Sequence, residues 1–120
     1  MLWQVTWQKN IYDYKRLIDD YKNGKHTGFI KTSKGMAKMC VEPKIDDIVY
    51  ISCNKLKIMK CKVVSNFVEN QQEMIDLYHI GNTHIHSHTQ NNTFLMLQII
   101  EIYDNPEKMN GFQRTWVKLE

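Results

Sequence analysis

The chain has few cysteines and no long apolar run, and both absences exclude classes of protein. Its three cysteines, Cys40, Cys53 and Cys61, are an odd number without the close pairing of metal ligands. We therefore expect a reducing compartment rather than a disulfide framework. No stretch approaches the ~18 apolar residues of a membrane span, and residues 1–10 lack the pattern of a signal peptide. These absences predict an intracellular protein of cytoplasm or nucleus that has no membrane partner.

A strong charge of either sign is also lacking. The net charge of +3 suits an anionic partner without requiring one. Hydrophobic residues make up 42% and charged residues 24% of the chain, as in ordinary globular proteins. A length of 120 residues suits one domain, so we expect residues 1–120 to fold as a single unit.

Known catalytic motifs are missing as well. The sequence has no Gly-rich phosphate loop, no GxSxG and no HExxH. The three cysteines lie in or beside apolar, strand-like runs, so we expect them to be packed rather than nucleophilic. The sequence therefore predicts no catalytic residue and no cofactor, and an enzyme is the less favoured interpretation.

The N-terminal quarter predicts a strand and then a helix. Residues 2–7, LWQVTW, alternate with the period of a strand. Apolar residues then recur at helical spacing over residues 10–24, with Asn10 as the expected N-cap. Gly24 stands where a helix often ends with a left-handed residue.

The rest of the chain predicts mainly strands and turns. Pro43 to Asp46 suit a turn, Asn54 and Lys55 suit a tight hairpin, and the alternation slips near Met59 as at a β-bulge. Residues 66–81 fit a short helix or an irregular connection. Strands are expected over residues 28–32, 47–52, 56–65, 93–103 and 114–119. This order predicts an α+β domain with a curved or closed, mainly antiparallel sheet, one N-terminal helix and one or two short helices.

Several of these segments together resemble a known superfamily. They are LWQVTW, the helix over 10–24, TGFIKTSKGMAKM, PKIDDIVYIS and KIMKCKVVS. In this order they resemble the PUA-like superfamily, and within it the EVE, YTH and ASCH group, over about the first 65 residues. Asp46 departs from the pattern, because it stands where a turn glycine is usual. Aspartate tolerates a left-handed backbone better than most residues, so the turn can persist.

The resemblance implies a small PUA-like β-barrel that reads nucleic acid, either DNA or RNA, and holds one nucleotide, including modified ones, in an aromatic pocket. Stacking on aromatic side chains contributes on the order of 1–3 kcal/mol per base. The residues implied to bind the base or nucleotide are Trp7, Phe29, Thr32, Ser33, Lys34, Gly35 and Trp116. Those implied to contact phosphate are Lys31, Lys38, Lys57, Lys60 and Arg114.

Structural interpretations of the same residues stand beside the functional ones. Trp3 and Trp7 share one face of a strand, and two tryptophans on an inward face suit a hydrophobic core. Lysines on exposed strand faces also protect sheet edges and aid solubility. Residues 32–35 suit a polar turn as well as a binding loop.

Two other functions are compatible with the same fold. One is a protein–protein interaction module of viral or phage origin, which would bind its partner through Met36, Met39 and residues 105–116. The other is an ASCH-type hydrolase of nucleosides or RNA, which would use Lys34 with Glu42 or Glu101.

A histidine-rich stretch raises the question of a metal. His84, His86 and His88 alternate, so on a strand they would point the same way and could share an ion. Ligands beyond them, such as His79 or Glu101, would have to approach through folding. The polar residues around the stretch favour a solvated loop, with contact to phosphate or RNA as the alternative, so we predict no metal site there.

Overall fold

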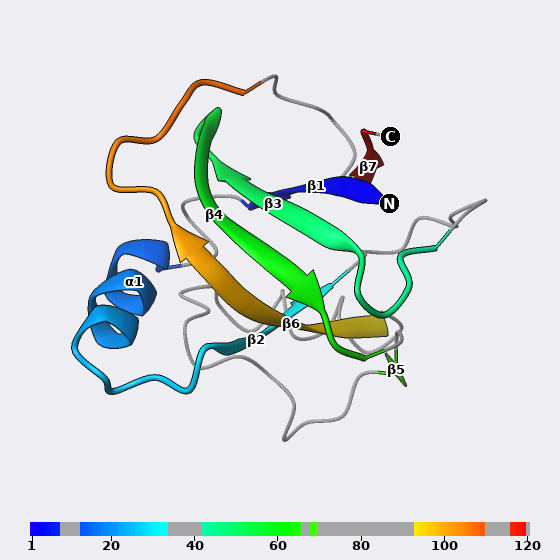
Figure 1. Cartoon of the computed structure of the whole chain (residues 1–120), viewed down its shortest axis with the longest axis horizontal. Coiled ribbons are helices and arrows are strands. Elements are labelled where there is room, and N and C mark those ends of the chain that lie inside the picture. Colours follow the sequence, from blue (N-terminus) through cyan, green and yellow to red (C-terminus); the bar gives the residue numbers. More distant parts are fainter. Residues whose placement is uncertain (8–12, 34–41, 66–67, 70–92, 110–115, 120) are drawn as a thin grey trace, which may run out of the picture.

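The computed structural model describes residues 1–7, 13–33, 42–65, 68–69, 93–109 and 116–119. They form one helix and a single mixed β-sheet, which confirms the α+β class (Figure 1). Within this part of the chain no second helix is present. The elements in order are β1 (Leu2–Trp7), α1 (Tyr14–Lys22), β2 (Phe29–Ser33), β3 (Ile48–Cys53), β4 (Leu56–Val63), β5 (Val68–Glu69), β6 (Thr93–Ile102) and β7 (Trp116–Lys118).

The strands follow the order β2-β6-β4-β3-β1-β7, with β5 paired to β6. Strand β1 runs parallel to β3, from Leu2 opposite Ile48 to Trp7 opposite Cys53, and the other pairs are antiparallel. The parallel pair makes the sheet mixed. Parallel strands need a long connection, and the one between β1 and β3 carries α1 and β2. Among the described residues no pairing joins β2 to β7, so the sheet is not closed and the expected barrel is not confirmed.

The predicted turns around β3 are confirmed. Asp46 has a φ of +76°, so the aspartate adopts the left-handed backbone that a turn glycine usually supplies. Asn54 and Lys55 have φ values of +54° and +61°, as both central residues of a type I′ hairpin require. The register between β3 and β4 shifts just beyond Met59, which confirms the predicted bulge.

Helix α1 begins later than its apolar pattern predicts. Its N-cap is Asp13, whose carboxylate accepts a hydrogen bond from the Arg16 amide at 3.3 Å. The prediction of Asn10 as N-cap was wrong, because the helix begins at Tyr14 and the Asp13 carboxylate accepts from an amide of its first turn. Leu17 is fully buried, and Gly24 follows the helix with a φ of +73°, as expected.

One hydrophobic cluster fills the concave side of the sheet, which we call the inner face. Alternate residues of β1, β3, β4 and β6 point into it, as the period of two requires. Cys53 and Cys61 belong to this cluster, which confirms that they are packed, and burial raises the pKa of the Cys61 thiol. The buried apolar residues are Trp3, Val5, Trp7, Leu17, Ile30, Val49, Ile51, Cys53, Ile58, Met59, Cys61, Val63, Leu95, Leu97, Ile99 and Trp116.

Candidate nucleic-acid interface

Two strands that are far apart in the sheet order meet through one side-chain pair. The Trp7 indole Nε1 donates a hydrogen bond to the Thr32 hydroxyl at 3.2 Å, and both residues are buried. Trp7 ends β1 and Thr32 lies in β2, and three strands separate them in the order of the sheet. The sheet therefore curves until the inner faces of β1 and β2 touch. We call the contact between these residues the Trp7–Thr32 seam.

The seam brings together two of the predicted nucleotide-binding residues and excludes a third. Ile30 and Thr32 are buried on the inner face of β2, whereas Phe29 is 47% exposed. Because neighbouring residues of a strand point to opposite faces, Phe29 lies on the outer face, away from Trp7. Ser33 is the last residue of β2 and follows Thr32 directly.

Trp116 lies in the interior against another tryptophan. It pairs with Val5 across β1 and β7, and its ring meets Trp3 edge to face, with centroids 6.0 Å apart and an angle of 77°. Such aromatic pairs contribute about 0.5–1.5 kcal/mol beyond the area that they bury. The burial of Trp3 favours the core interpretation for that residue.

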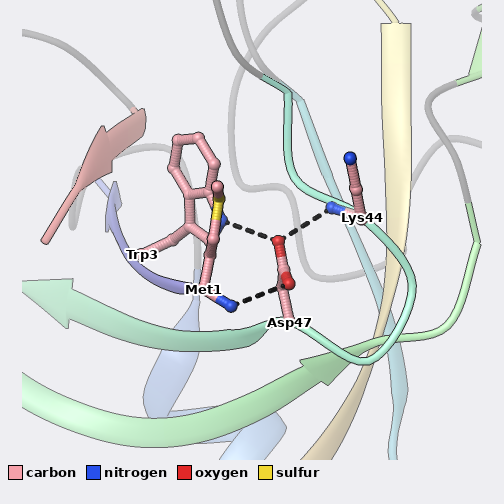
Figure 2. Close-up of polar contacts among 4 residues, drawn as sticks. All are labelled: Met1, Trp3, Lys44 and Asp47. Atoms are coloured by element: carbon pink, nitrogen blue, oxygen red, sulfur yellow. Dashed lines mark hydrogen bonds and ion pairs between the residues drawn. The ribbon is translucent and has the colours of Figure 1, made fainter. Parts of the chain in front are cut away.

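The acidic turn before β3 has a structural role that is visible in Figure 2. The Asp47 carboxylate accepts hydrogen bonds from the Met1 amine at 3.0 Å, the Trp3 indole at 3.0 Å and the Lys44 amide at 2.9 Å. Burial alone raises the pKa of Asp47, but these three donors outweigh it and hold the pKa below its ordinary value. The carboxylate therefore ties the start of β1 to the start of β3.

On the outer face, Lys57 is surrounded by partners. Its Nζ lies 4.7 Å from the centroid of the Tyr50 ring, 4.9 Å from that of Tyr103 and 3.6 Å from the Glu107 carboxylate. Burial, the charge of Glu101 and a hydrogen bond to it raise the pKa of Tyr103. The Lys57 side chain is only 19% exposed, so its ammonium is less accessible to phosphate than the sequence predicted.

Of the other described lysines of β4, Lys62 is more exposed than Lys57. Lys62 lies 4.0 Å from Asp46, and their side chains are 39% and 79% exposed. Lys60 is half-buried and stands opposite Tyr50 on β3 and Glu101 on β6. Positive and negative side chains therefore alternate across this face, and it is not a continuous basic track.

The remaining predicted residues fall largely outside the described part of the chain. The backbone of Lys31 belongs to β2. Outside the described residues lie Lys34, Gly35, Met36, Lys38, Met39, Cys40, His79, His84, His86, His88 and Arg114. Among the residues described, no three histidine, cysteine or acidic side chains gather as metal ligands, and no helix could span a membrane. The roles predicted for the residues outside the described part of the chain stay predictions.

Two features of this region were missed from the sequence. Asp47 was assigned to the start of a strand, and its role as an acceptor was missed because Met1 and Trp3 donate to it from 46 and 44 positions away in sequence. Lys57 also contacts Tyr103, which follows β6 and is far in sequence from the β3–β4 hairpin, so no local pattern identifies the contact.

The chain was also compared with known proteins. No protein-family model matches it, and no curated protein matches it.

Proposed function

We propose that the chain is a nucleic-acid-binding module that holds a single nucleotide beside the Trp7–Thr32 seam. The observation that carries this proposal is the 3.2 Å hydrogen bond that joins β1 to β2. It connects Trp7 and Thr32, two residues that the resemblance to PUA-like domains implies as nucleotide-binding. A flipped base needs a flat apolar surface and a few fixed polar groups, and the buried seam would support such a pocket from inside the domain.

The burial of the seam decides the roles within the site. Trp7 is only 2% exposed, so we assign it the wall that supports the site rather than an open stacking surface. Thr32 is 1% exposed, so it belongs to the same wall, and the indole fixes the position of its hydroxyl. We assign the contact with the edge of the base to Ser33, Lys34 and Gly35, as the resemblance implies.

Binding is tested directly by titrating labelled oligonucleotides. DNA and RNA of one sequence, with and without modified bases, would be followed by fluorescence anisotropy at low salt. We expect dissociation constants well below the millimolar range and tighter binding of one modified base. The proposal is wrong if every oligonucleotide binds no more tightly than millimolar.

A matched pair of variants then tests the location. Trp7→Phe keeps an aromatic ring but removes the donor to Thr32, and Trp3→Phe makes the same change elsewhere in the core by removing the donor to Asp47. Loss of this hydrogen bond should lower the free energy of unfolding by about 0.5–1.5 kcal/mol, and Trp7→Phe should also weaken nucleotide binding because the wall of the site is no longer fixed. Trp3→Phe should leave the affinity unchanged, with thermal melts showing that both variants are folded. Equal losses in the two variants would place the nucleotide elsewhere.

A further inference from the structure

We propose that single-stranded nucleic acid also lies across the outer face of the sheet, with a base stacked on Phe29 and a phosphate at Lys62. This inference rests on the proposed function and adds a second contact surface to it. The surface consists of Phe29, Gln98 and Lys62, which we call the outer row.

The register of three strands builds the outer row. Phe29 of β2 stands opposite Gln98 of β6, and Gln98 stands opposite Lys62 of β4. Directly opposed residues share a face, with Cβ atoms about 4.5–5.5 Å apart. The next residues along, Ile30 and Leu97, are buried on the inner face, so the outer row points away from the core.

The three side chains match the three parts of a nucleotide. A half-exposed phenyl ring offers a stacking surface to any base, because every base has a π-face. The Gln98 amide can both donate to and accept from a base edge, and the Lys62 ammonium donates to phosphate. Phe29 is 47% exposed and the Lys62 side chain 39%. Helix α1 lies beside the end of the sheet in Figure 1, and β4 and β6 lie in front.

The charges around the outer row favour Lys62 over Lys57 as a phosphate contact. Lys57 is enclosed by two tyrosine rings and by Glu107. Lys62 faces only the highly exposed Asp46 among the ion pairs of the described residues, at 4.0 Å. Exposed pairs of this kind contribute about 0–1 kcal/mol, so a phosphate can displace the carboxylate. A single strand fits better than a duplex, because stacking on Phe29 needs an unpaired base.

The test uses oligodeoxythymidine and oligouridine of about 12 nucleotides, within the size range of single-strand sites, and a DNA duplex of the same length. Phe29→Ala should weaken single-strand binding by about 5- to 150-fold, the range expected for one lost stack. Phe29→Tyr, which keeps the ring, should restore it. Lys62→Ala should weaken binding and reduce the slope of affinity against salt by about 1. Lys15→Ala, which removes the same charge from the exposed surface of α1, is the matched control.

The outcomes separate this inference from the proposed function. If the wild-type protein binds single strands and both Phe29→Ala and Lys62→Ala bind equally well, the outer row is wrong and the proposed function stands. Equal losses in Lys15→Ala and Lys62→Ala would indicate general charge attraction and also overturn it. Absence of binding to every oligonucleotide overturns both proposals. As a measurement without variants, amide shifts on adding oligodeoxythymidine should be largest around residues 29, 62 and 98, and shifts confined elsewhere would contradict the inference.

Discussion

The tryptophans on the inner face of the sheet are at most 6% exposed, whereas Phe29 on its outer face is 47% exposed. Two of the inner indoles also have defined acceptors, since Trp3 donates to Asp47 and Trp7 donates to Thr32. A buried indole needs such an acceptor, and one that has it contributes to folding. The difference teaches that exposure, rather than aromatic character, separates residues that hold the fold from those available to a ligand.

The sharpest way to test this contrast is to truncate one aromatic residue on each face. Trp7→Ala should lower the free energy of unfolding by about 3–5 kcal/mol, because it removes a buried side chain and leaves a cavity. Phe29→Ala should change it by less than about 0.5 kcal/mol, as at most surface positions. Chemical denaturation of both variants measures the two values.

The stability of either variant can contradict this contrast between a buried and an exposed aromatic residue. A Trp7→Ala protein as stable as the wild type would show that the indole is not part of the core. A loss above about 2 kcal/mol in Phe29→Ala would indicate that this ring is packed, and the outer row would then lose its stacking surface.

Asp47 provides the next largest expected effect, and it depends on pH. Asp47→Asn keeps the shape of the side chain but loses the charge that three donors stabilise. Hydrogen bonds to a charged group have net values of about 1.5–3 kcal/mol, so we expect a loss of about 2–3 kcal/mol at pH 7. Denaturant melts at pH 7 measure it, and Asp46→Asn, in the exposed neighbour, is the matched control.

The pH dependence follows from the lowered pKa of Asp47. A carboxyl group whose pKa is lower in the folded state stabilises the protein fully above its unfolded pKa of about 3.9. That contribution disappears as the pH falls through the folded pKa, because the carboxylate must then take up a proton. The stabilities of the wild type and Asp47→Asn should therefore converge below about pH 4. A difference that stays constant down to pH 2 would contradict this account.

Local sequence patterns predicted the parts of the fold that depend on neighbouring residues. The alternation of residues 2–7, the Asn54–Lys55 hairpin and the bulge near Met59 were all identified, because each is set by side chains close in sequence. The parallel pairing of β1 with β3 was not, since it joins residues 46 positions apart.

The same limit applies to the candidate site. The sequence named Trp7 and Thr32 but could not show that their side chains meet, and it grouped Phe29 with them although the period of the strand places it on the other face. Lys57 was predicted as a phosphate contact because its strand is rich in lysine. Its enclosure depends on Tyr103, which follows β6 and reaches Lys57 only through tertiary folding.

The smallest expected effect concerns the turn that decides which residues of β3 and β4 reach each face. Lys55 has a φ of +61°, a left-handed conformation that costs residues with a Cβ about 1–2 kcal/mol. Glycine avoids this cost but loses more entropy on folding, so Lys55→Gly should raise the free energy of unfolding by about 0.5–1 kcal/mol. Asn54→Gly should raise it less, because asparagine tolerates this backbone better. Neither change touches the seam or the outer row, so oligonucleotide affinity should stay constant while the denaturation midpoint rises. A loss of stability in Lys55→Gly would show that the lysine side chain stabilises the hairpin by more than its backbone strain costs.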